Sequence, residues 1–146
     1  PYPSAEDLTE IVNRTTAGPP PALRRVADGP AIIEMGRIAR EVPIAQALTE
    51  EVVRLTLATH PRPDSPEFVR KMIRYGVSPR GAQAIVLGAK IRALTEGRLN
   101  VAREDIRAVA LPALRHRLIL TFEAEAAGAT ADDVLRAVLD QAPGLA

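Results

Sequence analysis

A candidate anion-binding segment is the run Gly76-Val77-Ser78-Pro79-Arg80. Ser78 is a preferred N-cap residue and Pro79 suits the first helical position, so a helix is predicted to begin here. Arg80 then falls in the first turn, where a cation meets the positive end of the helix dipole. Free backbone N–H groups and a guanidinium together can bind a phosphate. The alternative is a surface helix start whose arginine points into water.

The sequence lacks the residue patterns that other kinds of chemistry require. The sequence contains no phosphate-binding loop, no dinucleotide fingerprint and no zinc-protease or serine-hydrolase motif, so a self-contained enzyme is not expected. His60 and His116 have no Cys or His at ligand spacing, and no metal site is predicted. The acidic pairs Glu50-Glu51, Glu104-Asp105 and Asp132-Asp133 are predicted to lie in first turns of helices. Carboxylates there offset the helix dipole, so they are interpreted as capping groups rather than acid–base catalysts.

Composition limits the classes of protein further. With 146 residues, 47% of them hydrophobic, the chain can fill one core without disulfides, and it has no cysteine. Its 19 basic and 18 acidic residues nearly cancel, and only 3% of residues are aromatic, which argues against nucleic acid as a partner. No apolar run is long enough to span a membrane and no signal peptide is visible, so a cytoplasmic protein is expected.

Caps and apolar spacing predict an all-α bundle of about six to eight helices, with one short extended or hairpin segment. Ser4 with Asp7 and Thr130 with Asp133 form capping-box patterns, and the helix that follows Ser78 is predicted to end at Gly97. The predicted helices cover about 5–16, 29–42, 45–59, 66–75, 79–96, a stretch from Glu104-Asp105 past Pro112, and a stretch from Thr130 to Pro143-Gly144. The glycine–proline run 18–21 is predicted to be an extended spacer, and residues 22–28 stay unassigned.

Three local details follow from the same patterns. Gly76 is predicted to end helix 66–75 in the left-handed conformation. The helix after Arg80 is predicted to be central, because its small residues allow close approach of its neighbours. Its inward face is predicted to contain Ala84, Leu87, Gly88, Ile91 and Leu94. Residues 118–127 fit a strand at their start and a helix at their end, and both possibilities remain open.

Several motifs in this order together resemble a known family. They are Gly76 to Gly81, Gly97-Arg98 with Val101, Glu104-Asp105-Ile106 and Leu114-Arg115-His116-Arg117. The combination is similar to the C-terminal helical lid of a MoxR-type AAA+ ATPase and extends along most of the chain. Tyr2-Pro3 resembles the point where the family's α/β nucleotide-binding domain joins the lid. The resemblance thus implies that residues 1–146 are one lid domain, cut from a longer protein.

The resemblance also implies a role for the candidate segment. Arg80 would be the sensor 2 arginine, which reaches the terminal phosphates of ATP in its own subunit or across a ring, and Ser78 and Pro79 would accompany it in cofactor binding. Val77 stands where the family usually has alanine. ATP with Mg would be bound by the full-length protein, whose phosphate loop and magnesium ligands would lie before Pro1. The fragment alone is therefore expected to be inactive.

The same resemblance implies partners. These would be the chain's own α/β ATPase domain, neighbouring subunits of a ring, and proteins with a von Willebrand factor A domain, in chaperone-like remodelling. Two alternatives remain open: a small helical module that binds a nucleic-acid backbone at Arg80, and an adaptor without a nucleotide role. The first predicts DNA binding with a steep salt dependence. A phosphate loop upstream of Pro1 would distinguish the lid from the adaptor.

Overall fold

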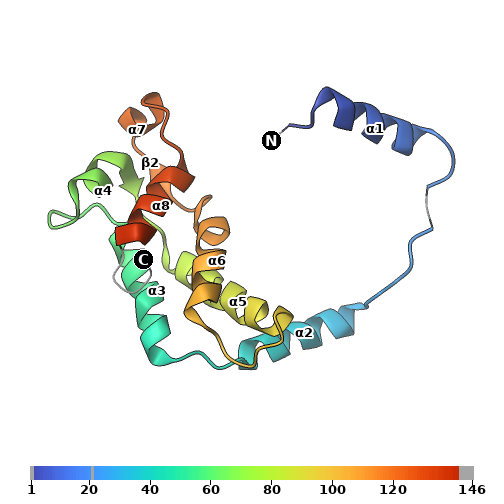
Figure 1. Cartoon of the computed structure of the whole chain (residues 1–146), viewed down its shortest axis with the longest axis horizontal. Coiled ribbons are helices and arrows are strands. Elements are labelled where there is room, and N and C mark those ends of the chain that lie inside the picture. The colour runs from blue at the N-terminus through green and yellow to red at the C-terminus, as the bar shows by residue number, and fades with distance from the viewer. Residues whose placement is uncertain (1, 21, 142–146) are drawn as a thin grey trace. The chain divides into compact units, whose positions relative to one another are not determined.

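The computed structural model describes residues 2–20 and 22–141, and most of them are helical (Figure 1). The chain divides into two units, residues 1–32 and 33–146. In the first unit, α1 (Ala5–Thr16) begins with the predicted capping box: the Ser4 hydroxyl accepts from Asp7 N at 3.1 Å, and Asp7 accepts from Ser4 N at 3.2 Å. α2 (Gly29–Glu41) crosses from the first unit into the second.

Residues 33–141, the described part of the second unit, contain the other helices and one antiparallel strand pair. In chain order these are α3 (Gln46–Ala58), α4 (Glu67–Met72), β1 (Ile73–Tyr75), α5 (Pro79–Thr95), α6 (Arg103–Leu114), β2 (Ile119–Leu120), α7 (Phe122–Ala126) and α8 (Ala131–Gln141). The predicted all-α fold class is therefore confirmed. The capping box before α8 is also as predicted, with Thr130 and Asp133 bonded reciprocally. Pro143-Gly144, the predicted end of that helix, lies outside the described residues.

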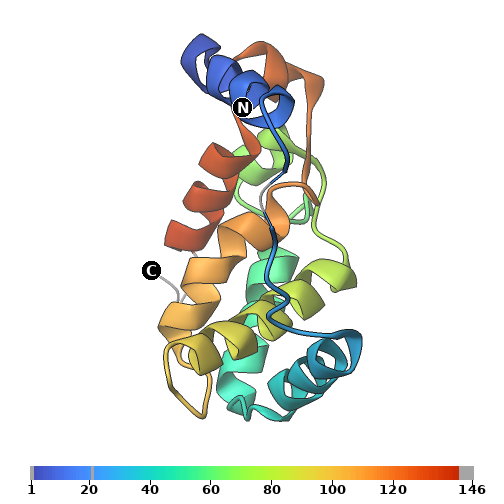
Figure 2. The same cartoon turned by 90° about the vertical axis from the view of Figure 1, so that its right-hand side faces the viewer.

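The core of the second unit forms around α5. Figures 1 and 2 both show α6 running beside α5, and α3 also packs against α5. The largest completely buried side chains come from several elements of the unit: Leu55, Ile73, Ile85, Ile106, Leu114 and Leu135. α6 continues through Pro112 to Leu114.

The buried face of α5 differs from the predicted one. The residues excluded from solvent are Gly81, Ile85, Ala89 and Ala93, which repeat every four positions. Leu87 and Ile91, which were predicted to face inward, are 37% and 51% exposed. The prediction was wrong at Leu87 and Ile91, and the buried stripe runs through Ile85 and Ala89 rather than through the adjacent Ala84 and Gly88. Apolar spacing within one helix cannot fix which of two neighbouring stripes meets the other helices.

The predicted helix 66–75 is shorter in the structure. α4 ends at Met72, because the next three residues leave the helix to pair with β2: Ile73 lies opposite Leu120 and Tyr75 opposite Ile119. Residues 118–127 thus contain both predicted alternatives, a two-residue strand followed by α7. Pairing between segments about 45 residues apart is a tertiary effect that local propensity does not contain.

Gly76 has a different role from the predicted one. The described glycines with positive φ are Gly18, Gly97 and Gly128, and Gly76 is not among them. A Cβ at Gly76 would lie 2.7 Å from the Thr59 carbonyl oxygen and 2.8 Å from the His60 ring. Glycine is therefore needed here for close backbone approach rather than for a left-handed helix end.

The first turn of α5 generates a stability prediction. A Cβ at Gly81 would overlap Cγ1 of the buried Val77 and lie 3.0 Å from Cδ2 of Leu114. Gly81→Ala should lower the free energy of unfolding by about 1–3 kcal/mol, although alanine is the better helix former. Urea denaturation of the chain measures this change.

A matched control is Gly36→Ala in α2. The nearest atom to a Cβ there is Nη1 of the flexible Arg40 side chain at 3.5 Å, so this substitution should be neutral or stabilise by up to about 1 kcal/mol. Equal stability of the two variants would contradict the packing of α5 on Val77.

Candidate functional site

The start of α5 has the predicted geometry, with one difference. Ser78 occupies the N-cap position in an extended conformation and Pro79 is the first helical residue, but the Ser78 side chain makes no capping hydrogen bond. Instead, Gly81 N donates to the Ser78 carbonyl oxygen at 2.8 Å. The segment Ser78-Pro79-Arg80 is exposed.

The positive end of α5 is not neutralised by the residues that the structure describes. The first turn contains no acidic residue and has no side-chain cap. The Arg80 side chain forms no hydrogen bond or ion pair with any described residue. Three other helix starts differ from that of α5. At α1 and α8 an aspartate, Asp7 or Asp133, accepts hydrogen bonds from the cap residue. The start of α3 also lacks a side-chain cap, but its first turn contains no cation. The start of α5 therefore combines a dipole end with an exposed guanidinium.

A second arginine lies beside the same turn. Leu114 is completely buried, and Cδ of Arg117 comes within 3.5 Å of the Cβ position at Gly81. Arg117 donates to the Ala113 carbonyl oxygen at 3.2 Å. The turn after α6 thus brings Leu114 and the aliphatic part of Arg117 against the beginning of α5.

Past the C-terminal end of α5, a buried carboxylate fixes the connection to α6. Asp105 is completely buried and accepts from Arg98 Nη1 at 2.6 Å, from Arg98 Nη2 at 2.5 Å and from Ala102 N at 2.9 Å. The Arg98 hydrogen bonds, more than the Ala102 amide and the nearby Arg92, hold the pKa of Asp105 below its usual range despite burial. Sequence reasoning placed Asp105 at a helix start, which is confirmed, but missed its pairing with Arg98.

A second buried acid corrects the prediction for Glu50-Glu51. α3 begins at Gln46, so this pair lies in the second turn rather than the first. The Glu51 side chain is 7% exposed and accepts from Arg103 Nε at 2.9 Å and Nη2 at 2.5 Å. These bonds lower the pKa of Glu51. The partner is 52 residues away, and a helix-capping interpretation could not find it.

Comparisons with known proteins identify the arrangement. Residues 67–138 match the family model described as AAA lid domain. They belong to the AAA lid domains. The chain is 34% identical over 139 residues to Chaperone MoxR1 of Mycobacterium tuberculosis, which covers 94% of this chain. It is 47% identical over 51 residues to Protein MoxR of Paracoccus denitrificans, which covers 35% of this chain.

A solved structure agrees with this assignment. A Cytophaga hutchinsonii protein assigned as an ATPase superposes with a TM-score of 0.79 over 97% of this chain at 26% identity. The predicted resemblance to the lid of a MoxR-type AAA+ ATPase is therefore confirmed. The chain spans 37% of the mycobacterial chaperone, 15% of the Paracoccus protein and 43% of the Cytophaga chain.

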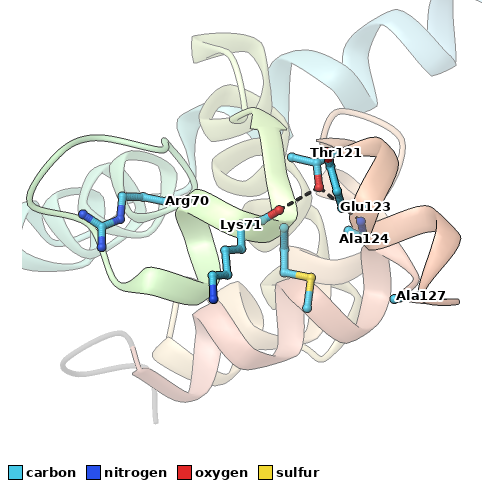
Figure 3. A pocket seen from close by; sticks show the side chains of 7 residues that line it. Arg70, Lys71, Thr121, Glu123, Ala124 and Ala127 are labelled. Carbon is cyan, nitrogen blue, oxygen red and sulfur yellow. Dashed lines mark hydrogen bonds between the residues drawn. The ribbon is translucent and has the colours of Figure 1, made fainter.

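The described part of the lid contains a second feature that could suggest an anion site. An open hollow of about 520 Å³ is lined by Arg70, Lys71, Met72, Thr121, Glu123, Ala124 and Ala127 (Figure 3). Its two cations already have partners: Arg70 donates to the Pro63 carbonyl oxygen at 2.8 Å, and Lys71 lies 2.7 Å from Glu67. Thr121 joins the walls by donating to the Lys71 carbonyl oxygen at 2.6 Å. The hollow is thus a product of the strand pairing rather than an alternative to the start of α5.

Residues 2–20 and 22–141 contain no group of three or more His, Cys, Asp or Glu side chains able to hold a metal ion. His60 is bonded through Nε2 to the Val77 carbonyl oxygen at 3.0 Å. Within these residues no helix is long and apolar enough to cross a membrane.

The buried Arg98–Asp105 pair generates a pH-dependent prediction. Asp105→Asn should lower the free energy of unfolding by about 2–4 kcal/mol near neutral pH, because it removes the charge that balances Arg98. Since the folded-state pKa is depressed, the contribution of the aspartate is complete above about pH 4, the unfolded value, and is lost as pH falls through the folded value. Denaturation of both proteins at several pH values should show the difference shrinking on acidification.

The neighbouring Glu104 supplies the control. Its side chain is 72% exposed and lies 3.9 Å from Arg98, so Glu104→Gln should change stability little. A loss for Glu104→Gln as large as that for Asp105→Asn would mean that net charge, rather than the buried pair, is responsible.

Proposed function

We propose that this lid contributes Arg80 as the sensor 2 arginine to ATP hydrolysis by a longer MoxR-type AAA+ ATPase. The observation that carries the proposal is the uncompensated positive start of α5, where Arg80 is exposed and has no described partner. A developing negative charge on the terminal phosphates is the kind of ligand such a position stabilises. Ser78 and Pro79 set the helix start and so the direction of the arginine.

The free energies involved show that Arg80 could supply only a small part of the binding of ATP. A charge-assisted hydrogen bond contributes roughly 1.5–3 kcal/mol, whereas micromolar binding requires about 8 kcal/mol. Arg80 therefore reports and stabilises charge on a nucleotide that an α/β domain outside this chain holds with Mg. In this arrangement the lid would contribute one cationic contact to the bound nucleotide, and the α/β domain would supply the magnesium ligands.

The activity and partners of the longer protein follow from the same proposal. It hydrolyses ATP, assembles with neighbouring subunits into a ring, and remodels partner proteins in the manner of a chaperone, with von Willebrand factor A domain proteins among the partners. Residues 1–146 would act as one lid domain in the cytoplasm. The similarity to the mycobacterial Chaperone MoxR1 and to the Cytophaga ATPase structure supports this proposal.

Arg80→Ala in the full-length protein should slow ATP hydrolysis about ten- to two-hundredfold, because about 1.4 kcal/mol of lost transition-state stabilisation is tenfold in rate. Steady-state kinetics with ATP measures this. Arg107→Ala is the matched control, since Arg107 is an exposed arginine on α6 at a distance in sequence from the start of α5. Hydrolysis at the parent rate by the Arg80 variant would sink the assigned role.

The isolated chain should show no measurable ATP binding in calorimetry at micromolar to submillimolar nucleotide. One guanidinium contact and a helix dipole fall several kcal/mol short of that affinity. The full-length protein serves as the positive control under the same conditions. Tight binding by residues 1–146 alone would mean that the chain contains a complete nucleotide site.

A further inference from the structure

The segment that precedes Arg80 is held by two side chains from the end of α3. The buried Thr59 hydroxyl accepts from Val77 N at 2.9 Å and donates to the Thr56 carbonyl oxygen at 2.7 Å. His60 Nε2 lies 3.0 Å from the Val77 carbonyl oxygen and so donates to it. Both backbone polar groups of Val77 are thus bonded by the two consecutive residues that follow α3.

Packing tightens the same junction. The Gly76 backbone lies so near the Thr59 carbonyl oxygen and the His60 ring that a Cβ would not fit without a shift. The Val77 side chain is completely buried and lies directly against Gly81 in the first turn of α5. We refer to Thr59, His60, Gly76 and Val77 as the α3–α5 clamp. Only Ser78 and Pro79 separate it from Arg80.

The His60 loop is itself fixed. Ser65 Oγ donates to the His60 carbonyl oxygen at 2.8 Å and accepts from Arg62 N at 3.1 Å. The clamp therefore connects Val77 to a closed loop and to the end of α3, rather than to a side chain free to rotate. A proline at the first helical position adds a restricted φ immediately after it.

We propose that Thr59 and His60 are positioning residues that set the location and direction of Arg80 for the phosphate contact. This inference rests on the proposed sensor 2 role of Arg80. A contact made in the transition state is sensitive to misplacement, because an error of about 1 Å costs up to about a hundredfold in rate. Loss of the clamp should therefore act on hydrolysis through Arg80, with less effect on ground-state ATP binding.

The test uses the full-length protein and Thr59→Val, which keeps the shape of the side chain but removes the hydroxyl. We expect kcat for ATP hydrolysis to fall about tenfold and KM for ATP to change less than about twofold. Thr59→Ser, which retains the hydroxyl, should restore most of kcat. The matched control is Thr95→Val, because Thr95 is an exposed residue at the other end of α5 whose hydroxyl bonds only to Arg92 O among the described residues.

A double-mutant cycle separates positioning from a general structural effect. In an Arg80→Ala background, Thr59→Val should change kcat by less than about twofold, because the group it positions is absent. If Thr59→Val reduced kcat equally with and without Arg80, or not at all in the folded protein, the positioning role would be wrong. If Arg80→Ala alone had no effect, the proposed function would fail instead.

His60 provides an independent pair should Thr59→Val fail to fold. His60→Leu removes the donor to the Val77 carbonyl oxygen, whereas the amide nitrogen of His60→Gln can take the place of Nε2. We expect a several-fold loss of kcat for His60→Leu and recovery for His60→Gln, with both effects absent when Arg80 is alanine. Equal activity of the two His60 variants would overturn the inference for this residue.

Discussion

Close packing along α5 is the constraint on which the rest of the lid depends. Ile85, Ala89 and Ala93 repeat every four residues and are completely excluded from solvent. A Cβ at Gly88 would lie 3.4 Å from the Val109 side chain, which is an ordinary contact, so the space between the α5 backbone and α6 at this point is about that of one methyl group. Because protein interiors are close-packed, a helix held in this way has little freedom to slide or rotate. Its two ends therefore occupy defined positions.

The charges of the lid are arranged around that packing. Near the C-terminal end of α5, the buried carboxylate of Asp105 is balanced by Arg98, and Glu51 is balanced by Arg103 where α3 meets α6. A buried charge without a partner is strongly unfavourable, so these two acids stabilise the fold only while they remain paired with their arginines. Near the N-terminal end of α5, Arg80 is left exposed beside a dipole of the same sign. The asymmetry makes one end of the helix structural and leaves the other able to interact with an anion.

The same geometry explains how a single arginine could matter to a whole lid. A helix of 17 residues is about 25 Å long, so a small movement at its start is carried as a rigid displacement to its far end. The α3–α5 clamp and the Arg98–Asp105 pair connect the two ends to neighbouring elements. In the proposed ATPase, a change at the terminal phosphates would thus move the lid as a body. On that proposal, Arg80 would couple the nucleotide to the position of the lid rather than form a complete binding site.

The sequence by itself determined the fold class, most helix starts and the position of Arg80, because caps, prolines and glycines act on residues within a few positions of themselves. Ser4, Thr130 and Gly97 behave as their local patterns predict. Only the tertiary structure decided the rest: that residues 73–75 leave the helix to pair with β2, which stripe of α5 is buried, and that Glu51 is buried against Arg103. The partners in these interactions are distant in the chain or on another helix, and so are the clamp residues Thr59 and Val77. Local propensity contains no information about them, since their energies arise when the elements meet.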